Sequence, residues 1–362
     1  MKNALTIILF FNLISCNIHT KNEIEPNISF NFDAAEGYFN LIDSLKIKNH
    51  ISNKQWNNYL KIEGNSLYIK ENNIPKSFTD KLRKTITDIY TSNDSINESY
   101  YENDIFYKIR SMYKKNDTLY RNHLVWIRNN LASIADSMVL RTTKFLPENK
   151  LTNDSLFKIY YHALDHDGSA NDKGIFISIM AAIQNNNRRL ANFESHEFHH
   201  LQRPNILEKI NIDPIDKGII WALDATLNEG IADMVDKDVM LSEASDWWLK
   251  EMVNNFYIGQ SEAVILKLDE TIRKQAKGIH HTTDDFRDIL LGTVGHVPGY
   301  WMAKVIVDNG RNKDLIKVAD NPFAFFILYD EITKQNPEEY PSFSRSTIEY
   351  IKELEQKYKI KG

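Results

Sequence analysis

The segment His196-Glu197-Phe198-His199-His200 places three imidazoles and a carboxylate within five consecutive positions. On a helix, His196 and His200 are four residues apart and share a face, so both imidazoles can reach one metal ion. Glu197 is offset by one residue, which places its carboxylate beside the open position of that ion. The spacing therefore predicts a zinc site for hydrolysis, in which Glu197 takes a proton from the attacking water.

Other interpretations of the histidine run stay open at this point. His196 and His199 are three residues apart, so the pair that shares a ligand could be a different one, and a solvated run needs no metal at all. The flanking Leu190, Phe193 and Leu201 give the segment an apolar helical face, which favours a packed helix. Histidines there could be satisfied core residues, but three of them beside a glutamate are costly to bury.

A catalytic zinc needs three protein ligands and one open position, so a third ligand must lie downstream. The best candidate is Glu229, in Asn228-Glu229-Gly230-Ile231-Ala232-Asp233. Apolar residues such as Ile219 and Leu227 predict a helix that turns Glu229 inward; an exposed acidic face is the alternative. Asp233 lies one turn further on and could accept a hydrogen bond from the far nitrogen of a ligand histidine, which would fix its tautomer.

An H-E-x-x-H helix followed by N-E-x-x-x-D on a second helix resembles the gluzincin metallopeptidases, of which thermolysin is the type. The resemblance covers about residues 175–235. It implies His196, His200 and Glu229 as ligands of one Zn²⁺ ion, Glu197 as the general base, and Asp233 as the carboxylate behind a ligand. More closely, the chain resembles an uncharacterised family of bacterial proteins described as zinc-dependent peptidases.

Two features depart from the gluzincin pattern. The short core leaves no room for the long N-terminal β-domain of thermolysin. The Gly-x-Met-x-Asn motif of gluzincin aminopeptidases is also absent, which favours endopeptidase action over exopeptidase action.

A peptidase also needs a donor for the oxyanion that forms when water attacks the carbonyl, a contribution of about 10²–10³ in rate. The candidate source is the segment 292–302, where glycines and a proline interrupt an aromatic-rich helical pattern. Similar zinc peptidases often place a Tyr or His near the substrate carbonyl, so His296 is the first candidate and Tyr300 the second. An ordinary kinked helix with a buried tyrosine is the alternative. His280 and His281 could belong to a mobile lid or could simply be exposed.

The pattern along the chain predicts an α+β fold that is predominantly α-helical. A zincin-like catalytic core, with a small sheet packed on the H-E-x-x-H helix, follows a helical N-terminal region. Segments 157–164 and 174–180 have strand character, and the polar segment 165–173 between them is a solvated connection that only faintly resembles a calcium loop. The strand at 174–180 could pair with extended substrate or be purely structural.

Helical periodicity fills most of the remaining chain. It covers about residues 32–146, where Ser52 and Gln55 have capping-box spacing. One helix ends before Pro204, and another begins near Asp213-Pro214 and runs to about residue 241. Further helices are expected within 244–275, 283–309 and 321–359, and the second of these is expected to be interrupted near 295–298.

The only cysteine, Cys16, follows Met1-Lys2-Asn3 and a short apolar run. The end of that run, Leu13-Ile14-Ser15-Cys16, resembles the bacterial lipobox, in which the cysteine is lipidated; an ordinary cleaved signal or a buried strand is the alternative. The resemblance implies a lipid-anchored protein of the cell envelope, at the outer membrane on its periplasmic or surface face. A single cysteine also excludes a CxxC metal site, so any zinc must use His and carboxylate ligands.

Length and net charge limit the class of protein and the number of regions in the chain. The chain has 362 residues and a net charge of −5, which gives no basic field for nucleic acid. The expected regions are a signal peptide (1–15), a tether (16–31), a helical N-terminal region (32–150) and a zinc-peptidase-like domain (151–362). The predicted activity is hydrolysis of a peptide or protein substrate. A non-enzymatic helical lipoprotein that binds a glycan or protein partner, or a zinc amidohydrolase with a non-peptide substrate, is the alternative.

Overall fold

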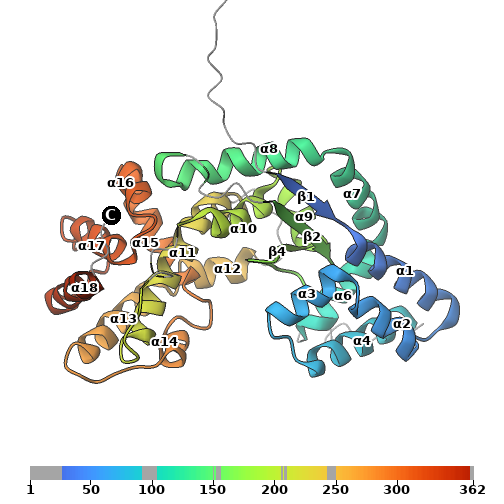
Figure 1. Cartoon of the computed structure of the whole chain (residues 1–362), viewed down its shortest axis with the longest axis horizontal. Coiled ribbons are helices and arrows are strands. Elements are labelled where there is room, and N and C mark those ends of the chain that lie inside the picture. Colours follow the sequence, from blue (N-terminus) through green and yellow to red (C-terminus); the bar gives the residue numbers. More distant parts are fainter. Residues whose placement is uncertain are drawn as a thin grey trace, which may run out of the picture.

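The computed structural model of the chain confirms a predominantly α-helical α+β fold, in which helices surround one small sheet (Figure 1). None of the helices it describes combines the length and the apolar character that a membrane span requires. The predicted signal peptide and Cys16 lie outside the described residues. The structure describes residues 27–91, 104–149, 151, 156–204, 207, 210–242 and 250–358.

The sheet is mixed, with the strand order β1-β2-β4-β3. Strand β1 (Ile28–Asn31) pairs in parallel with β2 (Phe157–His162), and β2 pairs in parallel with β4 (Gly174–Ser178). Strand β3 (Gly168–Asn171) pairs with β4 in the antiparallel direction and forms one edge of the sheet. Every residue of β4 is buried, as expected for a strand with neighbours on both sides.

The structure corrects three details of the predicted sheet. The connection 165–173 is not a plain solvated loop, because it contains β3. The strand predicted at 174–180 ends at Ser178, whose hydroxyl accepts from the Ala181 N–H at 3.1 Å and caps helix α9 (Ile179–Asn186). The predicted tether contains β1, which joins the sheet through its pairing with β2. Since β4 has strands on both sides, it cannot pair with substrate, and β3 is the edge strand beside it.

The helical pattern predicted for residues 32–146 is confirmed over the two described parts of this range, 32–91 and 104–146. The Ser52 hydroxyl accepts from the Gln55 N–H at 3.2 Å, and Gln55 Oε1 accepts from the Ser52 N–H at 3.0 Å, which forms the expected capping box. Most of these helices lie beside the sheet, toward the right of Figure 1, and the last of them, α8, runs along the top of that view. They are α1 (Asp33–Lys48), α2 (Asn53–Leu60), α3 (Glu63–Glu71), α4 (Lys76–Thr91), α6 (Ile105–Lys115), α7 (Asp117–Asn129) and α8 (Leu131–Thr142), followed by the 3₁₀ turns Thr143–Phe145 and Pro147–Asn149.

Helix α10 (Asn192–Gln202) ends just before Pro204, as predicted, and helix α11 (Lys217–Met240) follows. Helix α11 begins after the predicted Asp213-Pro214, because the Asp213 carbonyl accepts from the Asp216 N–H at 2.9 Å and closes a turn there. The Asp216 carboxylate in turn accepts from Lys357 Nζ at 2.8 Å, which ties the last helix to the start of α11.

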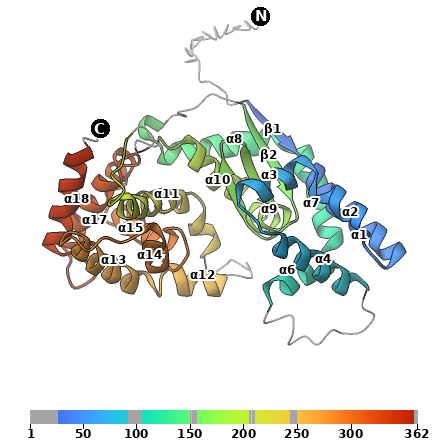
Figure 2. The same ribbon diagram turned by 60° about the horizontal axis from the view of Figure 1, so that its bottom comes forward.

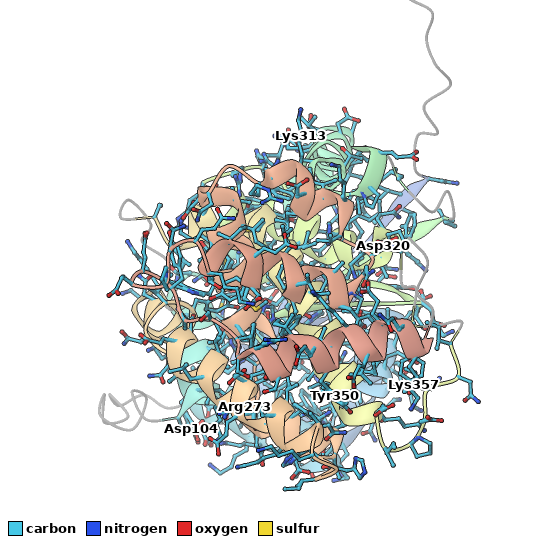
Figure 3. The ribbon with its side chains drawn as sticks, turned by 90° about the vertical axis from the view of Figure 1, so that its left-hand side faces the viewer. Asp104, Arg273, Lys313, Asp320, Tyr350 and Lys357 are labelled. Atoms are coloured by element: carbon cyan, nitrogen blue, oxygen red, sulfur yellow. The ribbon has the colours of Figure 1, made fainter. Side chains whose placement is uncertain are left out.

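The remaining helices gather on the other side of α11, where Figure 3 shows Tyr350 and Lys357 on the last of them. The break predicted near residues 295–298 lies at 290–295, and Pro298 falls inside the first turn of the next helix. These helices are α12 (Lys250–Tyr257), α13 (Ser261–Gln275), α14 (Thr283–Ile289), α15 (His296–Asp308), α16 (Asn312–Lys317), α17 (Pro322–Thr333) and α18 (Arg345–Tyr358).

The buried apolar residues form two clusters that meet between α10 and α11. The N-terminal cluster runs from Phe32 to Phe198 and includes the sheet and the apolar side of α10. The C-terminal cluster runs from Leu207 to Leu354 and includes the apolar side of α11. Figure 2 shows these two helices between the two groups of elements. The predicted domain boundary at residue 150 stays a prediction, while the clusters divide the chain near residue 204.

Candidate metal centre

Helices α10 and α11 lie against each other, and hydrogen bonds fix their register at both ends of α10. Just before α10, Arg189 Nη2 donates to the Val235 carbonyl at 2.7 Å. Just after it, Arg203 Nε donates to Asn228 Oδ1 at 2.9 Å. The two helices therefore run antiparallel, and the histidines of α10 lie opposite the carboxylates of α11.

Three predicted site residues meet at one point between these helices. The Nε2 atoms of His196 and His200 are 3.1 Å apart. Glu229 Oε2 lies 3.7 Å from the first of these nitrogens and 3.4 Å from the second. All three donor atoms lie within 4.8 Å of one another, so two imidazoles from the N-terminal cluster face a carboxylate from the C-terminal cluster.

These donor atoms fit a zinc ion. Two donors about 2.1 Å from a tetrahedral ion are about 3.4 Å apart, and the three separations here lie on either side of that value. Glu229 Oε2 is buried and receives no hydrogen bond, as expected for a lone pair that points at a cation. Burial opposes the charged form of Glu229, but the imidazoles of His200 and His296 outweigh it and hold its pKa well below the usual value.

The third histidine of the run turns away from this point. His199 is fully buried, and its Nε2 lies 3.4 Å from the Phe145 carbonyl oxygen. Burial lowers the pKa of His199 to about 3, so it is a neutral residue of the core. The ambiguity between the His196–His199 and His196–His200 pairs is thereby removed, because only the second pair faces Glu229.

Glu197 lies between the metal centre and the edge strand β3. A Cβ atom added to Gly168 of β3 would stand 3.2 Å from Glu197 Oε1 and 2.7 Å from the Phe193 ring. The close Phe193 ring and the Phe176 carbonyl oxygen, 2.9 Å from the same Cβ position, therefore favour glycine at position 168, and the Glu197 carboxylate lies directly beside it. Burial raises the pKa of Glu197, which moves it toward the range where a carboxylate exchanges protons near neutral pH.

The hydrogen-bond partner predicted for the ligand histidine was wrong. His196 Nδ1 lies 3.0 Å from Asp236 Oδ1 but 3.7 Å from Asp233 Oδ1, which is too long for a hydrogen bond. Asp233 instead accepts from His296 Nδ1, at 3.0 and 3.1 Å to its two oxygens. The sequence offered a signal for Asp236, because positions 229, 233 and 236 lie on one face of a helix.

A second group of potential ligands, His196, Asp233 and Asp236, already holds a cation. Lys237 Nζ lies 3.1 Å from Asp233 Oδ1 and 2.9 Å from Asp236 Oδ2. Burial opposes the charged form of Lys237, but the two carboxylates outweigh it and hold its pKa well above the usual value. The Lys237 ammonium already neutralises part of the charge of the two carboxylates. The point where His196, His200 and Glu229 meet is therefore the better place for a metal ion.

Helix α15 brings His296 to the same point because glycines allow it to pack closely on α11. A Cβ atom at Gly299 would lie 2.2 Å from the Thr226 carbonyl oxygen, and one at Gly230 would lie 2.5 Å from the Gly299 oxygen. His296 Nε2 lies 3.3 Å from Glu229 Oε2. Burial opposes the charged form of His296, but Asp233 and Glu229 outweigh it and raise the pKa of the imidazole.

The second oxyanion candidate, Tyr300, is buried one turn further along α15, and burial raises its pKa. Its ring packs edge-on against Tyr257 of α12, with 5.8 Å between centroids. The Tyr257 ring also lies 5.8 Å from the His296 ring, so it lines the site. Sequence reasoning missed Tyr257, because α12 carries no motif that points to the metal.

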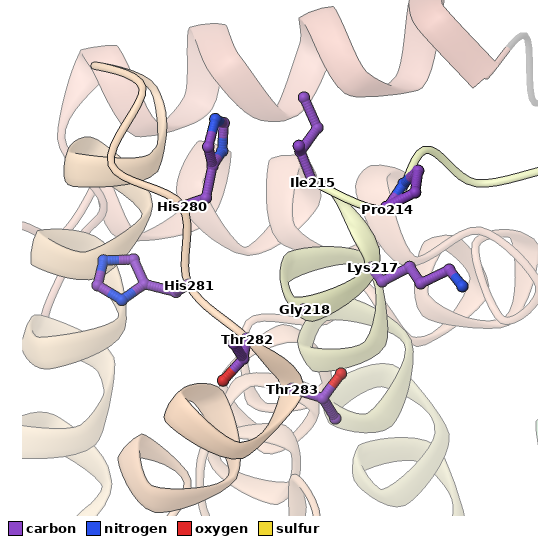
Figure 4. Close-up of a pocket in the computed structure, with 8 residues that line it drawn as sticks. All are labelled: Pro214, Ile215, Lys217, Gly218, His280, His281, Thr282 and Thr283. Atoms are coloured by element: carbon purple, nitrogen blue, oxygen red, sulfur yellow. The ribbon is translucent and has the colours of Figure 1, made fainter.

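The sequence also singled out two other polar segments, the loop before β3 and the pair His280 and His281. In the loop before β3, the Asp165 carboxylate accepts from the Tyr68 hydroxyl and from the Asp167 N–H. His280 and His281 line a cavity of about 410 Å³ at the start of α11, together with Lys217. Figure 4 shows the two imidazoles pointing in different directions. This cavity lies eleven residues of α11 from Glu229, about 16 Å, so the lid interpretation does not fit.

Comparison with known protein families places the chain in one of them. A family model described as "Putative zinc dependent peptidase (DUF5700)" matches residues 56–338. This range is more than half of the chain and contains the complete group of His196, His200 and Glu229. No curated protein and no solved structure matches the chain.

Proposed function

The chain belongs to the family of zinc-dependent peptidases that its sequence matches, and we propose that it hydrolyses internal peptide bonds. One zinc ion is held by His196, His200 and Glu229. The observation that carries the proposal is the convergence of three donor atoms, from two helices, at tetrahedral spacing, and one of them, Glu229 Oε2, is buried and receives no hydrogen bond. When bound, zinc supplies a Lewis acid that makes water more acidic and polarises a carbonyl oxygen.

Glu197 is the proton carrier of the proposed reaction. It takes a proton from the attacking water and passes it to the leaving nitrogen. Its burial beside Gly168 supports this role, because a raised pKa lets one carboxyl group accept and then release a proton.

His296 is the proposed donor to the oxyanion. Asp233 accepts the Nδ1–H, which directs Nε2 toward the metal ligand Glu229 and the space around it. An imidazolium has a proton on both nitrogens, so Nε2 can donate to the developing negative charge. His296 Nε2 lies 3.3 Å from Glu229 Oε2, whereas the Tyr300 ring packs on the ring of Tyr257, which makes His296 the better of the two candidates.

Strand β3 is the proposed binding edge for an extended substrate. It is the sheet edge nearest the metal centre, and its Gly168 lies directly beside Glu197. Backbone pairing along such an edge gives affinity with little sequence selection. The missing Gly-x-Met-x-Asn motif supports cleavage within a chain rather than at its end.

The proposed location is the cell envelope, with a lipid on Cys16 as the only membrane attachment. The lipobox-like Leu13-Ile14-Ser15-Cys16 supports this location. Replacement of Cys16 by Ser should move the protein from the membrane fraction to the soluble fraction of the producing cell.

The Glu197→Gln variant tests the activity. It should bind zinc with unchanged stoichiometry, because Glu197 is not one of the three ligands, and it should lose nearly all peptide hydrolysis. Turnover of a quenched fluorescent peptide library and zinc content are measured on the same samples. Full hydrolysis by the variant would contradict the proposal. Zinc binding by the wild type without cleavage of any peptide would favour a non-peptide amide, and absence of zinc binding would favour a binding protein.

A further inference from the structure

We infer that Asp236 and Lys237 are positioning residues of the zinc centre. Asp236 orients the ligand His196, and Lys237 holds the carboxylate of Asp236 together with that of Asp233. The inference rests on the proposed function, because it takes His196 as a zinc ligand and His296 as the oxyanion donor.

The first step concerns the tautomer of His196. A carboxylate can only accept, so the contact between Asp236 Oδ1 and His196 Nδ1 at 3.0 Å places a proton on Nδ1. The Nε2 atom of a neutral ring then carries a lone pair, and this atom faces Glu229 and His200. Asp236 therefore prepares His196 to bind a metal through Nε2.

Asp233, by contrast, does not form a hydrogen bond with His196. Both of its oxygens lie within 3.1 Å of His296 Nδ1, whereas its nearer approach to His196 Nδ1 is 3.7 Å. The two carboxylates thus serve different imidazoles. Asp236 acts on the residue that holds zinc, and Asp233 acts on the residue proposed to contact the substrate carbonyl.

Lys237 forms an ion pair with each of the two carboxylates. Its side chain is 6% exposed, and its ammonium lies within 3.1 Å of an oxygen of each. Two fully buried carboxylates this close would repel each other without a cation between them. With the ammonium in place, each carboxylate keeps one oxygen directed at its own imidazole.

The Asp236→Asn variant tests the first part, with Asp233→Asn as the matched control on the same helix face. Zinc affinity of the metal-free proteins is measured by competition with a chromophoric chelator, and kcat and KM are measured separately. Asp236→Asn should weaken zinc binding about 10–100-fold. Asp233→Asn should change zinc affinity less than threefold and lower kcat with little change in KM. Equal loss of zinc affinity in both variants would overturn the assignment.

Lys237→Met tests the second part through a double-mutant cycle. If Lys237 positions Asp236, then Asp236→Asn should weaken zinc binding less than threefold in the Lys237→Met background. The full 10–100-fold loss in that background would show that Lys237 has no positioning role. Circular dichroism of each metal-free variant confirms folding, and Lys237→Gln replaces Lys237→Met if the latter does not fold. A wild-type protein without zinc affinity would instead contradict the proposed function itself.

Discussion

Buried basic side chains have different hydrogen-bond partners in the two regions of the molecule. In the N-terminal cluster, Arg110 is held by backbone carbonyls, at 2.6 Å to the Ala163 oxygen, and His162 is buried among aromatic rings. Where α11 meets that cluster, Lys237, His196 and His296 are instead held by carboxylates. The comparison shows that side chains of the same types are structural in one region and available for chemistry in the other.

Helix α10 belongs to both regions and shows the difference within one turn. The Nε2 atom of His199 lies 3.4 Å from the Phe145 carbonyl oxygen, and burial lowers the pKa of this imidazole to about 3. His196, three residues earlier on the same helix, instead has its Nδ1 atom 3.0 Å from the Asp236 carboxylate. What changes between these neighbours is the element that they face, so the carboxylates of α11 create the candidate site.

The largest expected effect on stability is that of Lys237→Met. Loss of one partner from a buried ion pair costs about 3–5 kcal/mol, because it leaves buried charge uncompensated. Urea unfolding of the metal-free protein measures the effect. The control is Lys304→Met, which removes the same side chain from an exposed pair with Asp308 and should change stability by less than about 0.5 kcal/mol. Similar losses of stability in the two variants would mean that the buried Lys237 contributes no more to the fold than the exposed Lys304.

The next effect concerns His162 in the N-terminal cluster. Burial lowers its pKa from 6.5 to about 4, so the folded state resists a proton that the unfolded state accepts below pH 6.5. Stability should therefore fall as the pH drops from 6.5 to 4, by about 3 kcal/mol from this residue. Unfolding free energies at pH 7 and pH 4.5 should differ less in His162→Asn than in the wild type.

The exposed His50 provides the control for this measurement, and His50→Asn should keep the full pH dependence of the wild type. A wild-type pH dependence in His162→Asn would mean that His162 is not a neutral core residue. His162 would then not differ from His196 and His296, whose imidazoles contact carboxylates.

The smallest effect is expected at the contact between α11 and α15. Gly299→Ala would place a Cβ atom 2.2 Å from the Thr226 carbonyl oxygen, so the helices must separate. The cost in stability should be about 1–3 kcal/mol. Because His296 lies on α15 and the zinc ligands do not, kcat should fall while zinc affinity stays the same. Unchanged kcat in a destabilised variant would argue against a role for His296.

The sequence predicted the parts of the site that depend on local spacing. His196, Glu197 and His200 follow from one helical turn, and Glu229 follows from a second apolar helix. The break before α15 was likewise visible from its glycines, although Pro298 falls inside the helix that follows. These features need only the geometry of single elements, so they could be found without the fold.

The parts that the sequence did not predict depend on contacts between distant elements. Asp236 and Asp233 lie on the same face of α11, and only the position of α15 decides which imidazole each one contacts. Strand β1 lies in a polar segment that was predicted as a tether. The sequence did not reveal it because its pairing with β2 joins residues far apart in the chain. Strand β3 was hidden because edge strands can be short and polar.

The central claim is that zinc joins the two regions through Glu229. The direct measurement is zinc stoichiometry and affinity for the purified wild type and Glu229→Ala, with Asp224→Ala, a half-buried carboxylate on the same helix, as the control. We expect one zinc ion per wild-type chain and per Asp224→Ala chain, and at least a hundredfold weaker binding in Glu229→Ala. Unchanged zinc affinity in Glu229→Ala would contradict the account, because the third ligand would then lie elsewhere.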